Sequence, residues 1–293
     1  MTRHWLTPAL FGVVSFAVLS LVLGQVQAKN STLSSVTVNT LAQGPVKILP
    51  PGKVYMNILE FRQQPGSDFG PHAHQASIAY TLQGVDTISF PAAAAQSVGP
   101  GAAAFIPQQV VHTHRNLDGR IGAGAIAGGL IVGVVLLCAA TWLRGGPRRV
   151  TIAVLSILLI AGGTLPLIGA TSNDYYLIAV RPATQRTAPM PRPDGRVFYS
   201  SPDMQPVPAA PYVETLSAIS VPAGTTYDAP DAPGPEMIIV MDGTATVNIG
   251  DQTTRLGGGG GAFAQTGQTV AIGNQGSGTL KLLEFVVAGG AAG

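Results

Sequence analysis

Four of the five histidines in this 293-residue chain fall in two pairs, with one residue between the members of each pair. His72 and His74 form the first pair, and His112 and His114 form the second. On a β-strand, residues i and i+2 project from the same face, so each pair would present two imidazoles side by side. Neutral imidazole is the commonest metal ligand and suits Fe, Mn, Cu, Ni or Zn. The two pairs therefore predict a divalent transition-metal site whose metal is not identified by the sequence.

The segments around these histidines are typical of an all-β structure. Short apolar stretches occur at 54–61, 77–82, 237–241 and 280–287, and Gly and Pro interrupt the sequence between them. Strands of this length with frequent turn residues indicate a sandwich or a barrel.

An internal repeat runs through the β segments with an offset of 158 residues. The matching residues are Gly66, Phe105, Pro107, His112 and Asn116 in the first copy, and Gly224, Phe263, Gln265, Val270 and Asn274 in the second. A strand at 280–287 closely follows Asn274, whereas a similar stretch after Asn116 is found only at 174–184. We therefore expect a duplicated β unit in which residues 174–184 complete the first copy.

Two motifs in the first copy resemble those of the cupin superfamily. The first motif is matched by Gly66, His72, His74 and Gly84, and the second by Gly101, Pro107, His112 and Asn116. Ser77 stands where cupins usually have a glutamate, and Gln109 replaces a usual glycine. The resemblance covers about 45–118 and 197–288. It implies a bicupin, with two jelly-roll barrels.

The resemblance also implies roles for the histidines. It makes His72, His74 and His112 metal ligands, and leaves His114 or Ser77 as an additional group at or near the metal. In the second copy the three histidine positions carry Pro230, Ala232 and Val270, and the glutamate position carries Glu236. The metal motif is thus kept in part in the first barrel and is degenerate in the second. Catalytic residues are not assigned.

Three segments, 5–28, 121–143 and 150–170, contain no Asp, Glu, Lys or Arg. Each has about the 20 residues that cross a bilayer as a helix. We expect 1–28 to be a signal peptide or an anchor helix, and the other two to form an inserted transmembrane hairpin. The turn 144–149 carries three arginines, which indicates a cytoplasmic side. The predicted location is the cell membrane, with both barrels outside the cytoplasm.

The sequence therefore predicts an all-β protein of two cupin-type jelly-roll barrels with an N-terminal signal or anchor helix and the inserted hairpin. The predicted parts are 1–28, the first cupin at 45–118 plus 174–184, transmembrane helices at 121–143 and 150–170, a Pro-rich linker at 185–212, and the second cupin at 213–288. A charged content of 10% and a net charge of +2 argue against nucleic acid as a partner.

The predicted function is that of a membrane-anchored extracytoplasmic bicupin whose first barrel binds a divalent metal and a small organic molecule. By analogy with cupins, it would be a metal-dependent, dioxygenase-like oxidoreductase. One alternative is a non-catalytic binding or sensory module of a membrane complex, and another is a metal-free structural bicupin. The expected partners are a small-molecule ligand and the membrane, together with a second copy in a homodimer or a membrane protein.

Overall fold

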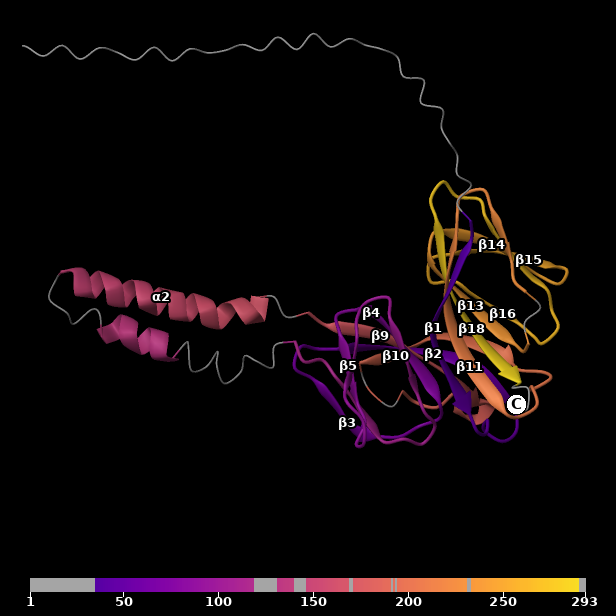
Figure 1. The fold of residues 1–293 in the computed structure, drawn as a ribbon, viewed down its shortest axis with the longest axis horizontal. Coiled ribbons are helices and arrows are strands. Elements are labelled where there is room, and N and C mark those ends of the chain that lie inside the picture. Colours follow the sequence, from indigo (N-terminus) through magenta and orange to yellow (C-terminus); the bar gives the residue numbers. More distant parts are fainter. Residues whose placement is uncertain are drawn as a thin grey trace, which may run out of the picture. The chain divides into compact units, whose positions relative to one another are not determined.

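Antiparallel strands form most of the described secondary structure in a computed structural model (Figure 1). The structure describes residues 35–118, 131–139, 146–168, 171–190, 192, 194–230 and 233–289. The predicted signal or anchor segment, 1–28, lies outside these described residues.

The first β unit consists of two sheets with a shared apolar core. Its five-stranded sheet has the order β10 (Gly195–Asp203), β2 (Val54–Gln63), β9 (Asn173–Pro182), β4 (Ser77–Gln83), β7 (Ala103–Ile106). Its four-stranded sheet has the order β3 (Asp68–His72), β8 (His112–Arg115), β5 (Asp86–Ser89), β6 (Gln96–Val98). Side chains from both sheets, among them Phe61, Phe69, Ile88 and Ile106, are buried together between them.

The second β unit repeats this arrangement strand for strand. Its larger sheet has the order β1 (Thr37–Val46), β11 (Tyr212–Val221), β18 (Leu280–Gly289), β13 (Glu236–Asp242), β16 (Gly261–Ala264). Its smaller sheet has the order β12 (Thr226–Asp228), β17 (Val270–Asn274), β14 (Thr244–Ile249), β15 (Gln252–Gly257). Each unit therefore has the double-sheet architecture of a jelly-roll barrel.

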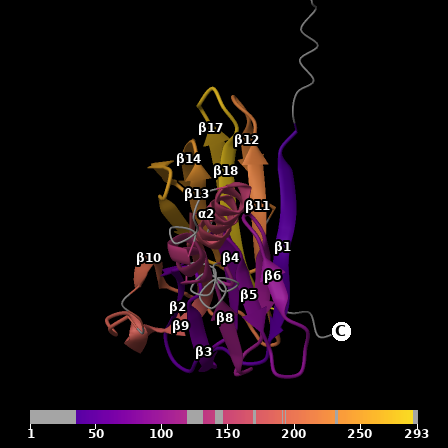
Figure 2. The same cartoon turned by 90° about the vertical axis from the view of Figure 1, so that its left-hand side faces the viewer.

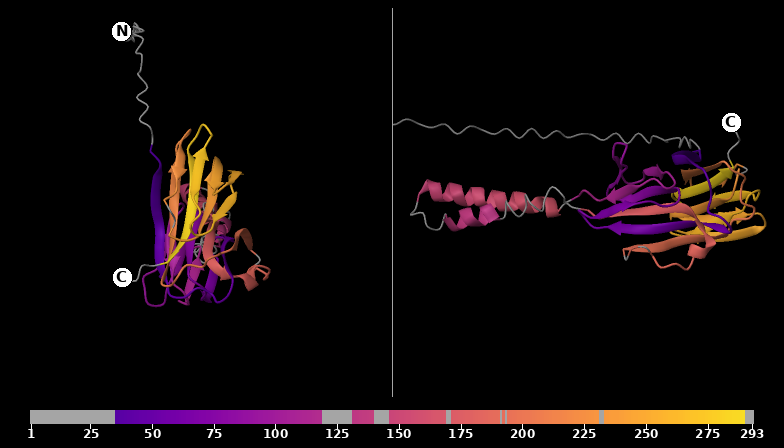
Figure 3. Two further views of the ribbon diagram at one scale, coloured as in Figure 1. Left: turned by 90° about the vertical axis from the view of Figure 1, so that its right-hand side faces the viewer. Right: turned by 90° about the horizontal axis from the view of Figure 1, so that it is seen from below.

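In each unit, one edge strand of the larger sheet comes from a part of the chain that lies next to the other unit in the sequence. The early strand β1 pairs with β11 of the second unit, and Figures 2 and 3 show it beside the orange and yellow strands. The later strand β10 pairs with β2 of the first unit. It lies within the stretch 185–212, which the sequence predicts to be a linker, and it follows a short 3₁₀ helix, η1 (Ala183–Gln185). The pairing of β1 and β10 therefore crosses the boundaries that the sequence predicts for the two cupin domains. Those boundaries stay a prediction.

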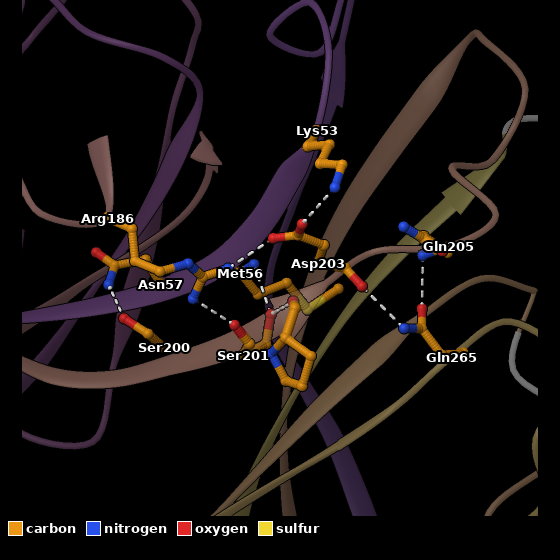
Figure 4. Close-up of polar contacts among 10 residues, drawn as sticks. Lys53, Met56, Asn57, Arg186, Ser200, Ser201, Asp203, Gln205 and Gln265 are labelled. Atoms are coloured by element: carbon orange, nitrogen blue, oxygen red, sulfur yellow. Dashed lines mark hydrogen bonds and ion pairs between the residues drawn. The ribbon is translucent and has the colours of Figure 1, made fainter. Parts of the chain in front are cut away.

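Polar side chains connect β10 to both units (Figure 4). The Asn57 amide donates to Ser200 Oγ at 2.9 Å, and the backbone N–H of Met56 donates to Ser201 Oγ at 2.9 Å. From the second unit, Gln265 accepts a hydrogen bond from the backbone N–H of Gln205 at 2.7 Å and donates to the Asp203 carbonyl at 2.8 Å. These contacts tie the end of β10 to the second barrel.

Strand β9 occupies the closing position of the first unit, between β2 and β4, where β18 lies in the second. Asn116 stabilises this arrangement, because its amide donates to the carbonyls of Gln63 at 3.1 Å and Thr171 at 2.8 Å. In the repeat, Asn274 donates in the same way to Val221 and Gly278. The repeated asparagine therefore bridges the two ends of the loop before the last strand, whatever the length of that loop.

The segment between β8 and β9 contains helix at residues 131–139 and in α2 (Pro147–Ile168), shown in magenta in Figure 1. In the part of the chain that the structure describes, no helix combines the length and the apolar character needed to span a membrane. The predicted transmembrane hairpin, and with it the predicted cell-membrane location, is therefore wrong.

The described helical residues differ from the predicted hairpin in their bounds. Of segment 121–143, the structure describes residues 131–139, which are helical. Helix α2 begins at Pro147, so it includes Arg148 and Arg149, which were expected in the turn 144–149. The fold class is thus two β barrels with helical residues inserted before β9, without the membrane hairpin.

Candidate metal centre

The four paired histidines lie together in the first barrel. His72 ends β3, His112 and His114 lie on β8, and the register pairs His72 with His112. One ligand atom from each of these three residues and from His74 lies within 4.8 Å of all the others. The ring centroids of His72 and His112 are 4.5 Å apart, and those of His74 and His112 are 4.7 Å apart. All four predicted imidazoles therefore converge on one point.

Each imidazole is oriented by a hydrogen bond at Nδ1. The acceptors are the carbonyl oxygens of Gly70 for His72 (2.8 Å), Gln75 for His74 (2.6 Å) and Val110 for His112 (2.8 Å), and the Asp86 carboxylate for His114 (2.6 Å). Because every acceptor lacks a proton to give, Nδ1 carries the hydrogen and Nε2 offers its lone pair. This is the tautomer that a metal ligand bonded through Nε2 requires.

The Nε2 atoms are the unsatisfied groups of the site. Those of His74, His112 and His114 are buried and have no hydrogen-bond partner in the structure. A buried polar atom without a partner costs on the order of 1–3 kcal/mol, so three together demand an explanation. A divalent cation at their point of convergence would satisfy all three. The residues present thus fit a metal ion.

Burial favours the neutral form of His72, His74 and His112. Desolvation lowers the pKa of His74 to about 3 and that of His112 to about 4, and the neighbouring imidazoles lower both further. Desolvation also lowers the pKa of His72. These three histidines are consequently deprotonated near neutral pH, which is the state that binds a metal.

Ser77, the sequence alternative to His114, lies on β4 with its hydroxyl buried and without a partner. His114 belongs to the group of converging histidine atoms. Two contacts hold His114. Its Nδ1 is hydrogen-bonded to Asp86, and the ring of Tyr175 stacks on the imidazole with centroids 5.1 Å apart and planes 5° apart.

The loop that carries His74 depends on an unusual residue. Gln109, at a position where cupins have glycine, adopts a φ of +58°, in the left-handed region that favours glycine. Its backbone N–H donates to the His74 carbonyl at 2.8 Å. Gln109 thus replaces the usual glycine but keeps the left-handed backbone conformation. Its hydrogen bond holds the loop that carries His74 against the segment of the second motif.

A cavity of about 410 Å³ opens beside the histidines. His72, His74 and His114 form part of its wall, and two arginines, Arg181 and Arg192, form another part. Sequence motifs pointed to none of Asp86, Tyr175, Arg181 or Arg192. These residues come from β5, β9 and the stretch after it, so only the strand pairing brings them to the site.

The second barrel has a different interior at the matching place. Glu236 is buried there with Oε1 unpaired. Burial, and next the nearby Glu284 carboxylate, raise the pKa of Glu236 to about 8. A carboxyl group that holds its proton near neutral pH is a poor metal ligand, in keeping with the degenerate motif.

The resemblance to cupins is confirmed by the paired sheets of both units and by the histidines of the first. No family model matches the sequence, and no curated protein matches it. Solved structures similar to the chain include AerE from Microcystis aeruginosa, with 12% identity, a TM-score of 0.44, and coverage of 85% of this chain and 98% of AerE.

Two further similar structures carry cupin or enzyme names. A cupin 2 conserved barrel domain protein from Leptotrichia buccalis has 11% identity and a TM-score of 0.39, with 87% of this chain and 89% of that one covered. A deletion mutant of the Bacillus subtilis oxalate decarboxylase OxdC has 11% identity and a TM-score of 0.46, with 85% and 77% covered.

Proposed function

We propose that the first barrel is a metal-dependent cupin centre in which His72, His74, His112 and His114 bind one divalent transition-metal ion beside a small-molecule cavity. The observation that carries this proposal is the convergence of three buried, unpartnered Nε2 atoms. The metal is Fe, Mn, Cu, Ni or Zn, because imidazole ligands suit all of these.

The adjoining cavity supports a role in binding or transforming a small organic molecule. It shares three of its wall residues with the histidine group, so a ligand in it would lie next to the ion. When bound, the ion would supply Lewis-acid or redox chemistry at that place. We propose a dioxygenase-like oxidoreductase, as the resemblance to cupins implies.

A second candidate is a non-catalytic binding module that uses the same centre. One observation favours it: among the described residues that line the cavity, none is Asp or Glu, so no carboxylate is at hand for proton transfer. The two candidates share the ion and the ligand, and they differ in turnover. Oxygen consumption with bound ligand would distinguish them.

Metal analysis of the purified full chain tests the centre. We expect about one equivalent of a transition metal after reconstitution, and less than about a tenth of an equivalent in His112→Ala and in His114→Ala. Thr81→Ala is the matched control, because it also truncates a buried polar residue of the first barrel, but its hydroxyl already donates to the Val98 carbonyl at 3.0 Å, and it should retain the metal. Failure of the unmodified chain to retain any transition metal after reconstitution would refute the proposal.

A further inference from the structure

The cavity beside the histidines has positive charge in its wall and nothing negative. Arg181 and Arg192 line it, and none of its described wall residues is Asp or Glu. A divalent ion held by the histidines would add further positive charge. The wall as a whole therefore favours an anion over a neutral or cationic ligand.

Arg181 is the residue that lacks a counter-ion. It lies near the end of β9, and no carboxylate in the described part of the chain forms an ion pair with it. Its Nε is buried without a hydrogen-bond partner, and its Nη1 makes only a long contact of 3.4 Å to Gln185. Arginine stays charged in proteins, so this guanidinium has donors to offer to an anion.

Arg192 is held differently. Its guanidinium lies 3.4 Å from the centroid of the Phe69 ring, and its Nε donates to Asp194 at 3.1 Å. The cation–π contact and the ion pair position this side chain at the cavity and partly neutralise it. Arg181 therefore provides the stronger attraction for an anion.

The rest of the wall is apolar. It is formed by Leu59, Phe61, Phe69, Tyr175 and Leu177. The rings of Phe61 and Tyr175 stack with centroids 5.5 Å apart, which makes a rigid aromatic surface. A ligand that fits both features has an apolar body and a charged end, and the cavity volume of about 410 Å³ restricts it to a small molecule.

We propose that this cavity binds a small organic carboxylate, with its carboxylate held by Arg181 and its apolar body against the aromatic wall. The inference rests on the proposed function, since it assigns the substrate class of that same site. A guanidinium binds a carboxylate through two parallel hydrogen bonds, which explains why arginine rather than lysine serves at this position.

Calorimetric titration of the full chain with benzoate, and with benzamide as its neutral counterpart, tests the proposal. We expect benzoate to bind at least about tenfold more tightly than benzamide, because a hydrogen bond to a charged group is stronger than a neutral one. Arg181→Gln should weaken benzoate binding by at least about tenfold and leave benzamide binding unchanged. Arg196→Gln is the matched control: it removes the same charge at an exposed residue that pairs with Glu60, away from the cavity, and should leave benzoate binding as it is.

Equal binding of benzoate and benzamide to the unmodified chain, or unchanged benzoate binding in a folded Arg181→Gln variant, would overturn the inference. Arg181→Lys keeps the charge and should lose less affinity than Arg181→Gln, and it serves if the glutamine variant does not fold. The comparison of benzoate with benzamide needs no variant at all.

The titrations are made on metal-reconstituted and on chelator-treated protein, so that the two proposals fail separately. If no metal is retained but benzoate binding still depends on Arg181, the metal proposal falls and the anion site stands. If metal is retained and benzoate shows no advantage over benzamide, only the anion site falls.

Discussion

At the scale of single residues, Asp86 has the clearest role outside the histidines themselves. Its side chain is fully buried, and one oxygen accepts from His114 Nδ1 at 2.6 Å. A carboxylate in this position fixes the tautomer of a ligand histidine and raises its basicity. Asp86 is thus a positioning residue for His114.

We predict that Asp86→Asn lowers metal affinity by about 10- to 100-fold, because an amide no longer enforces the Nε2 lone pair of His114. Competition with a chelator of known affinity measures this change. Asp68→Asn, on the same sheet with its partner Arg115, is the control and should have no effect on affinity. Equal metal affinity in Asp86→Asn and the unmodified chain would show that His114 needs no such support.

Glu236 gives the second barrel a pH dependence of known sign. In the unfolded chain its carboxyl ionises with a pKa near 4.5, whereas burial and Glu284 raise the pKa to about 8 in the folded chain. Between these values the folded state binds more protons, so the free energy of unfolding falls as the pH rises. The limit for one group is about 1.4 kcal/mol per pH unit.

We therefore predict that Glu236→Gln stabilises the protein at pH 8 relative to the unmodified chain and makes little difference near pH 5. Denaturant unfolding at both pH values measures this. Glu60→Gln, at an exposed ion pair with Arg196, should show no such pH-dependent gain. A stabilisation of the same size at both pH values would point to packing rather than ionisation.

At the scale of elements, the turn after β4 is a place where backbone contact limits the sequence. Gly84 has a φ of +74°, and a Cβ there would stand 2.5 Å from the carbonyl oxygen of Ser172. This contact joins the turn to the start of β9, the strand that closes the first barrel. Gly101 has a similar φ of +78° but has open space around it.

Comparing Gly84 with Gly101 separates two costs of replacing a glycine, the cost of a positive φ and the cost of a steric contact. Gly101→Ala should cost about 1–2 kcal/mol, because an L-residue is disfavoured at positive φ. Gly84→Ala should cost more, because the backbone of Ser172 must also move. Chemical denaturation of both variants measures the difference. If both alanines cost the same, the contact between the turn and β9 is not a constraint.

At the scale of the whole molecule, the two barrels share one apolar core in addition to their own. It contains Met56 and Ile178 from the first unit and Met237 and Phe285 from the second, all buried. The exchange of β1 and β10 adds backbone hydrogen bonds between the units. Unfolding one barrel would therefore expose apolar surface and an unpaired sheet edge on the other.

We predict a single calorimetric transition for the described β units. Ile106→Ala in the core of the first barrel and Ile272→Ala in the core of the second should each lower that one transition, at a cost of about 2–5 kcal/mol. Differential scanning calorimetry checks this. Two peaks, with each variant shifting only one of them, would mean that the barrels unfold independently.

The sequence by itself determined the class of the site. The i, i+2 spacing of the histidines, the repeat offset and the strand-like apolar stretches depend only on local periodicity, which a strand preserves. The transmembrane prediction for 121–143 and 150–170 depended on their uncharged composition alone, and no described helix has the length and apolar character that crossing a membrane requires. Helix α2 starts in the arginine-containing turn.

Only the tertiary structure decided which residues meet. Tyr175 and Arg181 lie far from the motifs along the chain, and Asp86 falls between the two motifs but belongs to neither; cross-strand register brings all three to the histidines. The place of His114 in the ligand group has the same origin, since β8 pairs with β3 and brings His112 and His114 beside His72. Spacing along a strand is a local property, whereas a binding site is formed by contacts between strands, and the sequence does not specify those contacts residue by residue.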